Sequence, residues 1–284
     1  MKKVVLLPNP HKDAEFSVSR RIAEVLRSVG IVVCIDRAFG TDLFGLAEVF
    51  SVLPADAQLL LVVGGDGSVL DASVFAIEHD LPLLGVNLGK LGYLSEVETG
   101  EIEKLARLAD DAFCTEEKML LCTERIVNGR SVDRSERLAL NDVVISHETY
   151  LGITDLRLSG GSGSVHYRAD GMILSTPAGS TAYSLSAGGP IVSHSVDAVL
   201  ATPVCPHSFF NRSILFSPQE QIDVQNAGQD TLRVSVDGRH FSDLLPGEIC
   251  RVTVSGRKVR FLTFRDNNMF SVLFRKMKTM EEIQ

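Results

Sequence analysis

The chain has 284 residues and a mass of 30.9 kDa, enough for one large domain or two smaller ones. Apolar residues make up 45% and charged residues 23%, a globular composition that excludes a disordered, collagenous or coiled-coil chain. The formal net charge of −8 disfavours a nucleic-acid partner, because binding to phosphate backbones needs a clustered excess of lysine and arginine.

Targeting and membrane signals are weak in this sequence. No apolar run approaches the roughly 20 residues that a membrane-spanning helix needs, and the apolar stretch after Met1 ends at Pro8, too early for a signal peptide. We therefore expect a cytoplasmic protein with no membrane partner. The five cysteines show no C-x-x-C spacing, so we expect buried thiols rather than disulfides or a zinc site.

The first third of the chain alternates short apolar runs with helical periodicity. This pattern is typical of a parallel sheet flanked by helices. In chain order it predicts a strand at residues 4–7, a helix at 14–28, a strand at 31–35, a buried strand at 59–63, a helix from Ser68, a strand at 81–86 and a helix at 101–111.

Beyond about residue 115 the pattern changes to short runs rich in Val, Ile, Leu and Thr, separated by turn residues. It predicts strands at residues 120–127, 138–145, 154–158, 171–175, 231–236, 250–254 and 259–264, followed by a helical end over 270–277. The fold class is thus an α/β N-terminal domain with a second, β-rich domain.

The string Gly64-Gly65-Asp66-Gly67 lies between the predicted buried strand and the helix that follows it. In open α/β sheets ligands bind beyond the carboxyl ends of strands, and backbone N–H groups at a helix N-terminus favour anions. Glycines let a phosphate approach, and a carboxylate beside phosphates indicates phosphoryl transfer, because it can bind a cation or accept a proton. A tight turn in which Asp66 caps the helix is the alternative.

Other phosphate-binding motifs do not fit the sequence. The stretch from Gly85 to Leu91 is one residue shorter than a P-loop, and it has leucine where a magnesium-binding hydroxyl is needed. The chain has no well-placed G-x-G-x-x-G, which disfavours a hydride-transferring Rossmann enzyme.

Residues 159–190 are rich in small and hydroxyl side chains, since 16 of these 32 residues are Gly, Ser or Thr. A flexible linker has this composition, but the interleaved apolar residues, among them Tyr167 and Tyr183, favour a folded surface. An aromatic ring surrounded by hydroxyls and carboxylates can hold a nucleoside. A Ser/Thr-rich turn into a helix is the alternative reading of the segment around Tyr183.

Asn141 and Asp142 interrupt an apolar run at residues 138–145. Such polar residues are commonly a bulge or a strand end. The functional alternative is that the carboxylate and the amide together bracket a sugar diol, accepting from its hydroxyls and donating to one of them.

Taken together, these three motifs resemble those of the NAD kinase family. The longest runs from Asp170 to Pro190, and the resemblance also covers Asn9-Pro10 and residues 87–92. It implies an NAD kinase-like two-domain fold, in which residues 1–115 and roughly 262–284 form the α/β domain with the GGDG loop. Residues 116–261 would form the β-rich domain with most of the dinucleotide-binding residues. The resemblance also implies a homodimer or homotetramer.

The resemblance assigns a role to each matching residue. Asp66 is expected to be the general base that takes the proton from the 2′-hydroxyl of the adenosine ribose of NAD, and Gly67 to let phosphates approach. Asn141 and Asp142 are expected to hold nucleoside edges and a ribose diol. The remaining substrate-binding residues implied are Arg168, from the same or a neighbouring subunit, Asp170, Thr181, Ala182, Tyr183, Ser184, Leu185 and Ser186.

The implied reaction is in-line transfer of the γ-phosphoryl group of ATP to NAD. Mg²⁺ would bridge the donor oxygens and be held mainly through the donor phosphates, with no metal site formed by the protein alone. Polyphosphate as donor, NADH as acceptor and feedback by NADP stay open. Asp71 stands where many family members carry a basic residue, so phosphate affinity and donor choice stay open as well.

Two other functions remain open from the sequence. A lipid kinase acting on diacylglycerol or a sphingoid base could share the G-G-D-G loop, but it would need an apolar acceptor pocket. A non-catalytic module that senses dinucleotides could share the second motif, although it would not need Asp66.

Overall fold

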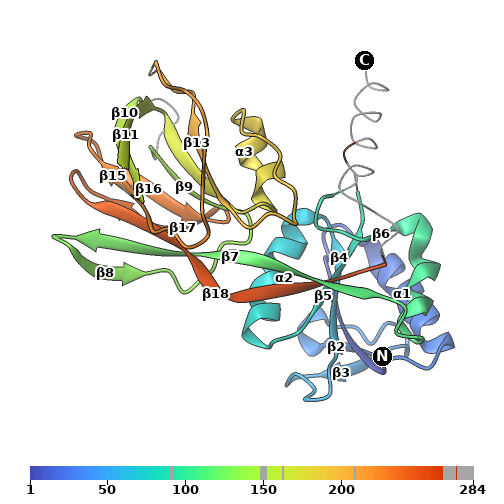
Figure 1. The fold of residues 1–284 in the computed structure, drawn as a ribbon. Helices are drawn as coiled ribbons and strands as arrows, with labels where there is room; N and C mark the ends of the chain where they lie inside the picture. The colour runs from blue at the N-terminus through green and yellow to red at the C-terminus, as the bar shows by residue number, and fades with distance from the viewer. Residues whose placement is uncertain (90–91, 148–151, 162, 208, 265–272, 274–284) are drawn as a thin grey trace. The chain divides into compact units, whose positions relative to one another are not determined.

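The computed structural model describes residues 1–89, 92–147, 152–161, 163–207, 209–264 and 273, and the fold is drawn in Figure 1. The chain divides into two compact units: Met1–Glu117 with the described residues from Val259 on, and Lys118–Lys258. The first unit is α/β and the second is β-rich, which confirms the predicted fold class. The predicted helical end at 270–277 and most of 262–284 lie outside the described residues.

The first unit is built on a parallel sheet. Its strands run in the order β3-β2-β1-β4-β5, and both β6 and the C-terminal end of β18 pair with β5. The strands are β1 (Lys3–Pro8), β2 (Val32–Asp36), β3 (Glu48–Phe50), β4 (Leu59–Gly64), β5 (Leu83–Asn87), β6 (Val97–Glu98) and β18 (Ile249–Thr263). The helices are η1 (Ala14–Phe16), α1 (Ser17–Ser28), η2 (Arg37–Phe39), α2 (Asp66–Glu78) and η3 (Thr99–Leu108).

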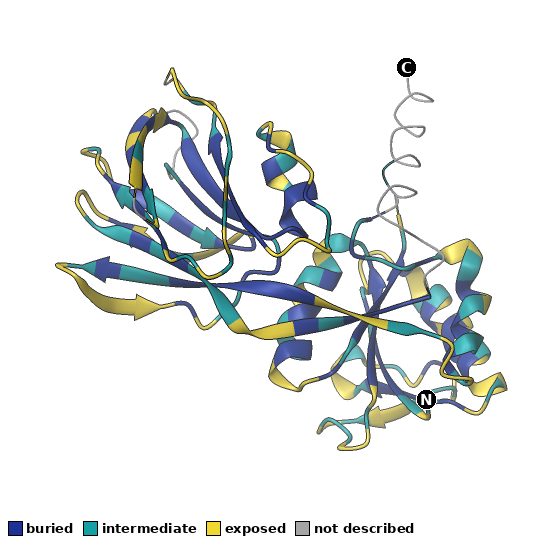
Figure 2. Ribbon diagram, in the orientation of Figure 1, coloured by how far each residue is buried: buried dark blue, intermediate teal, exposed yellow. Residues whose placement is uncertain are grey.

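Helices cover both faces of this sheet. Alternate residues of β4, such as Leu61 and Val63, share a core with α1 and η3. Helix α2 contacts β4 and β5 without joining that core, so it lies on the other face (Figure 1). All six residues of β4 and all five of β5 are buried, as Figure 2 shows. A strand covered on both faces needs the continuous apolar run from which β4 was predicted.

The helix predicted at residues 101–111 is a 3-10 helix, η3. Its buried residues are Ile102, Leu105 and Leu108, which recur at every third position. That spacing matches three residues per turn better than the 3.6 of an α-helix. The predicted helix is therefore present as a 3-10 helix that begins two residues earlier and ends three residues earlier than predicted.

The second unit is a sandwich of two antiparallel sheets. One sheet has the order β14-β13-β12-β9-β16-β17, and the other includes β11-β10-β15-β18 and the hairpin of β7 with β8. Apolar residues from the inner faces of both sheets form one core. The strands are β7 (Cys114–Val127), β8 (Arg130–Arg134), β9 (Asp142–His147), β10 (Thr154–Gly160), β11 (Gly163–Ala169), β12 (Gly171–Ser175), β13 (Val199–Val204), β14 (Ile214–Phe216), β15 (Ile222–Asn226), β16 (Leu232–Val236) and β17 (Arg239–Leu244).

Two strand predictions in the C-terminal half need correction. The runs at 250–254 and 259–264 belong to a single strand, β18, whose middle at residues 256–258 is exposed. Strand pairing uses backbone groups, so it can continue where the apolar pattern stops. The strand predicted at 138–145 begins only at Asp142. Ala139 forms an isolated bridge with Leu121 of β7, and the N–H groups of Leu140 and Asn141 donate to the Asp237 side chain.

Two further observations concern cysteines and membranes. All five cysteines are free thiols, but only Cys34, Cys122 and Cys250 are buried, and Cys205 is exposed. Within the described part of the chain, no helix combines the length and the apolar character that crossing a bilayer requires.

Candidate functional site

The G-G-D-G loop joins the buried strand β4 to helix α2. Gly64 ends the strand, Gly65 is the extended N-cap residue, and Asp66 is the first residue of the helix. Asp66 therefore does not cap the helix. Its carboxylate lies in the first turn, where the positive end of the helix dipole favours an anion.

Backbone groups of a second loop fix the Asp66 carboxylate. Its Oδ2 accepts a hydrogen bond from the N–H of Tyr93 at 2.8 Å, and its Oδ1 accepts one from the N–H of Leu94 at 3.1 Å. A Cβ atom on Gly92 would lie 1.9 Å from Oδ1, so only glycine leaves room for the carboxylate there. A carboxylate oxygen has two lone pairs, so beside these bonds from described residues each oxygen of Asp66 can accept a further hydrogen bond.

The glycines of the loop differ in what surrounds them. A Cβ atom on Gly64 would lie 2.4 Å from the Ser68 hydroxyl oxygen, which itself accepts a 2.8 Å hydrogen bond from Asn9 Nδ2. In contrast, nothing lies within 4 Å of a Cβ atom built on Gly67. Protein packing thus requires glycine at Gly64, whereas the space beside Gly67 is open.

Lys12, which the sequence motifs did not include, lies beside this loop. The Lys12 Nζ atom is 3.3 Å from the position that a Cβ atom on Gly65 would occupy. Lys12 follows the Asn9-Pro10 pair in the sequence, and it is exposed. Its position brings a positive charge to the N-terminus of α2.

In the second unit, Asn141 and Asp142 are bound to the segment that follows β12. Asp142 pairs with Ser175 across β9 and β12, and the N–H of Thr176 donates to Asn141 O at 2.9 Å. The Thr176 hydroxyl donates to Leu140 O at 2.6 Å. The Asn141-Asp142 pair and the motif of residues 170–190 are therefore joined by hydrogen bonds.

Asp142 is buried, with 7% of the residue exposed. Burial raises its pKa from 3.8 to about 7, and the neighbouring charge of Asp237 adds to the increase. The carboxylate of Asp237 is buried too, and burial raises its pKa, against the effect of three backbone hydrogen bonds and of Arg137. Asp142 therefore changes its protonation state nearer to neutral pH than an exposed aspartate does.

The segment from Thr181 to Ser186 presents side chains of two kinds. The hydroxyls of Thr181 and Ser184 are buried and bind Ala178 O at 3.0 Å and Thr202 Oγ1 at 2.9 Å. Tyr183 is 46% exposed, and Ser186 is exposed as well. Ala182 and Leu185 lie between them and are half-buried.

The charges of two other predicted residues of this unit, Asp142 and Asp170, act on Tyr183. Partial burial raises the pKa of its phenol, and the charges of Cys205, Asp142 and Asp170 raise it further. Asp170 connects β11 to β12, and its N–H donates to Val204 O at 2.9 Å. Arg168 is exposed on β11, opposite Asp155 of β10. The predicted residues from Asn141 to Ser186 thus belong to the second unit, while Asp66 and Gly67 belong to the first.

Sequence reasoning missed the structural importance of Asp237. Its carboxylate accepts hydrogen bonds from the N–H groups of Leu140, Asn141 and Asp142. Asp-Gly between two alternating strands is an ordinary signal for a hairpin turn, and it explains Asp237 without any further role. Only the burial of this turn residue, which is 8% exposed, distinguishes it.

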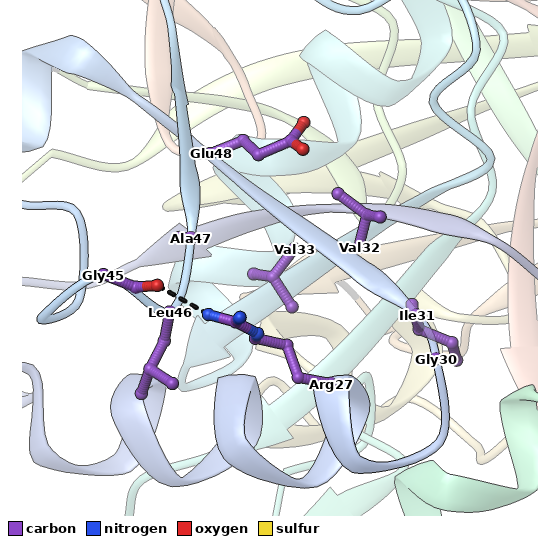
Figure 3. Close-up of a pocket in the computed structure, with 9 residues that line it drawn as sticks. All are labelled: Arg27, Gly30, Ile31, Val32, Val33, Gly45, Leu46, Ala47 and Glu48. Atoms are coloured by element: carbon purple, nitrogen blue, oxygen red, sulfur yellow. Dashed lines mark hydrogen bonds between the residues drawn. The ribbon is translucent and has the colours of Figure 1, made fainter.

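A separate cavity of about 350 Å³ lies in the first unit beside the end of α1 and the start of β2. As Figure 3 shows, Arg27 lies across it and donates a hydrogen bond to Gly45 O. Its lining contains none of the residues predicted for the site. The lining residues are Arg27, Gly30, Ile31, Val32, Val33, Gly45, Leu46, Ala47 and Glu48.

Two protein-family models match the chain. Residues 4–113 match the model of the ATP-NAD kinase N-terminal domain, and residues 140–264 match that of the ATP-NAD kinase C-terminal domain. The NAD kinase of Acetivibrio thermocellus is 36% identical over 281 residues, with 96% of each chain covered. That of Natranaerobius thermophilus is 32% identical over 289 residues, with 100% of each covered.

Solved structures show the same fold. Yeast NADH kinase in complex with NADH superposes with a TM-score of 0.80 and 22% identity, covering 96% of this chain and 86% of the yeast chain. An NAD kinase from Archaeoglobus fulgidus in complex with ATP superposes with a TM-score of 0.71 and 23% identity. The match covers 97% of this chain and 99% of the Archaeoglobus chain. None of these matches supports the lipid kinase or the non-catalytic sensor that the sequence left open. The predicted resemblance is confirmed, and this chain, a phosphotransferase, belongs to the NAD kinase family.

Proposed function

We propose that this NAD kinase transfers the γ-phosphoryl group of ATP to the 2′-hydroxyl of the adenosine ribose of NAD, with Asp66 as general base. The observation that carries the proposal is the fixed carboxylate of Asp66 at the start of α2. Its oxygens are oriented by the N–H groups of Tyr93 and Leu94, and each retains a lone pair for a substrate hydroxyl.

The loop around Asp66 is suited to phosphate. The open space beside Gly67 lets a phosphate approach the N-terminus of α2, where N–H groups and the helix dipole favour an anion. The Lys12 ammonium beside Gly65 adds positive charge. Asp71, which is exposed on the same helix, adds negative charge where relatives often carry a basic residue.

The second unit supplies nucleoside recognition in this proposal. The half-exposed Tyr183 ring provides a surface on which a base or ribose can stack. Asn141 and Asp142 bind ribose hydroxyls, Asp170 binds an amide or amine, and Arg168 binds the dinucleotide phosphates. Thr181, Ala182, Ser184, Leu185 and Ser186 complete the surface, and Ser186 has the exposed hydroxyl.

Mg²⁺ is the expected metal, and the residues present fit an ion held mainly by substrate. Within the described residues there is no cluster of three or more His, Cys, Asp or Glu side chains that could hold a metal. Mg²⁺ commonly binds through one or two carboxylates together with substrate phosphates and waters. When bound, it would neutralise charge on the donor oxygens. Asp66 is the carboxylate of the G-G-D-G loop that could contribute a ligand.

The test is a turnover assay of the purified protein with MgATP and NAD, in which product is read by an NADP-specific dehydrogenase. Phosphorus NMR of the product distinguishes a phosphate on the 2′-hydroxyl from one on another hydroxyl. We expect 2′-phosphorylated NAD. A product phosphorylated elsewhere, or turnover that survives removal of the Asp66 carboxylate, would contradict the mechanism. Parallel reactions with polyphosphate and NADH define the donor and the acceptor.

We further propose that the protein works in the cytoplasm as a homodimer or homotetramer. Support for the assembly comes from the family to which the chain belongs. Light scattering coupled to size-exclusion chromatography tests it, because a monomeric mass that persists with NAD bound would contradict the proposal.

A further inference from the structure

Asp237 occupies an unusual position for a turn residue. It lies between β16 and β17 and has a φ of +49°, followed by Gly238 at +74°, as a two-residue hairpin turn requires. Turn residues normally face solvent, yet Asp237 is 8% exposed. Burying a carboxylate is costly unless hydrogen bonds compensate for the lost water.

The compensation comes from three consecutive backbone groups. Asp237 Oδ2 accepts from Leu140 N at 2.9 Å, and Oδ1 accepts from Asn141 N at 2.9 Å and from Asp142 N at 3.1 Å. In return, the Asp237 N–H donates to Asp142 O at 2.9 Å. Charged acceptors make the stronger hydrogen bonds, so the carboxylate fixes the backbone just before β9.

We propose that Asp237 is a positioning residue for NAD binding, which holds the backbone of residues 140–142 so that the Asn141 and Asp142 side chains face the dinucleotide. The inference rests on the proposed role of Asn141 and Asp142. In this proposal Asp237 does not touch the substrate itself and acts through the backbone of residues 140–142.

The charge of Asp237 has a second effect on the same residue. It opposes ionisation of Asp142, whose pKa is raised first by burial and then by this neighbour. The positive charge of Arg137 acts against the effect of burial on the pKa of Asp237. The charge of Asp142 in turn raises the pKa of Tyr183, which lies in the short helix α3 (Tyr183–Ser186). Removing the charge of Asp237 therefore moves the ionisation of Asp142 to lower pH, an effect that a role in folding alone would not produce.

The experiment compares Asp237→Asn with Asp243→Asn, an exposed aspartate of the same hairpin. We expect Asp237→Asn to raise KM for NAD at least about tenfold, because the amide cannot accept all three backbone hydrogen bonds, with kcat changed less than about threefold. The inflection near neutral pH in kcat/KM for NAD should move to lower pH. Asp243→Asn should change neither quantity.

Further variants separate the possible failures. If Asp142→Asn weakens NAD binding and Asp237→Asn leaves KM and the pH profile unchanged, the positioning role is wrong and the proposed function stands. If Asp142→Asn leaves NAD binding unchanged, the assignment of the binding residues is wrong. Asp237→Glu keeps the charge but displaces the carboxylate, so it should raise KM without moving the inflection to lower pH.

Hydrogen exchange on the unaltered protein keeps the proposal testable if the Asp237 variants do not fold. The amides of Leu140, Asn141 and Asp142 should exchange slowly without NAD, because Asp237 holds them before substrate arrives. Exchange at the rate of an exposed loop in the free protein, with protection appearing only upon NAD binding, would overturn the inference.

Discussion

Gly179 lies directly against the backbone of Asn141. A Cβ atom on Gly179 would be 2.0 Å from Asn141 O and 2.5 Å from Asn141 C. Backbone atoms cannot rotate away as a flexible side chain can. The close approach therefore holds the segment after β12 and the residues before β9 in one arrangement.

Gly179→Ala should destabilise the protein by ~2–3 kcal/mol, because the added methyl group forces these two backbone segments apart. It should also raise KM for NAD, since Asn141 moves. Chemical denaturation and steady-state kinetics measure the two effects. Gly256→Ala is the matched control, because nothing lies within 4 Å of a Cβ atom there. Equal stability of the two variants would contradict the packing argument.

Asp66→Asn should lower kcat at least about a hundredfold and leave the Kd for NAD nearly unchanged. The amide retains shape and one acceptor oxygen but cannot take the proton of the ribose hydroxyl, and a positioned base contributes about 10²–10⁴-fold. Turnover and calorimetric titration provide the measurements. Glu78→Gln, at the exposed end of the same helix, should keep full activity. Parental turnover in Asp66→Asn would remove Asp66 from the mechanism.

Gly67→Ala should separate stability from function. The protein leaves open space around Gly67, so alanine should fold with an unchanged or slightly higher Tm, as alanine is favoured over glycine in a helix. The same methyl group should raise KM for ATP or NAD about tenfold or more, because it occupies the path of a phosphate. Thermal unfolding measures the Tm, and steady-state kinetics measures KM for ATP and for NAD. Unchanged KM values would show that phosphates do not approach here.

Asp142→Asn should make the protein more stable at alkaline pH and weaken NAD binding. The folded-state pKa of Asp142, about 7, lies above its ordinary value of 3.8. The folded state thus binds the proton more tightly, and stability falls as pH rises from about 4 to about 7. A shift of one pKa unit corresponds to about 1.4 kcal/mol. At pH 8 the free energy of unfolding of the variant should therefore exceed that of the parental protein by ~2–4 kcal/mol.

Urea denaturation at pH 5 and pH 8 measures this gain. Asp230→Asn, an exposed aspartate of the same unit, should show no such dependence on pH. Suppose that Asp142→Asn and the parental protein lose equal stability when the pH is raised from 5 to 8. The ionised Asp142 carboxylate would then not destabilise the folded state, and the argument from its raised pKa would be wrong.

The sequence predicted best where one strong local signal determines the structure. The continuous apolar run at residues 59–63 and the glycines after it gave strand β4, the loop and helix α2, although the helix begins at Asp66 rather than Ser68. Strand β12 has the predicted bounds of residues 171–175. The motif of residues 170–190 identified the family, because a long string of specific residues carries more information than composition.

Features that depend on residues far apart in the sequence were predicted poorly. The start of β9 at Asp142 depends on Asp237, and the orientation of Asp66 depends on the N–H groups of Tyr93 and Leu94. Backbone donors have no signature in a sequence, because every residue except proline carries one. The buried turn at Asp237 looks like any Asp-Gly hairpin until its burial is known.

The pairing of β5 with β18 sets an order for biosynthesis. Leu83 lies beside Phe261, so the Leu83 end of β5 stays an open edge while the ribosome makes the whole second unit. The second unit is continuous in sequence and can fold as it leaves the ribosome. The first unit can complete its sheet only after the end of β18 has been synthesised. Open edges recruit other strands, so we expect a nascent chain stalled before residue 259 to aggregate more readily than the full chain.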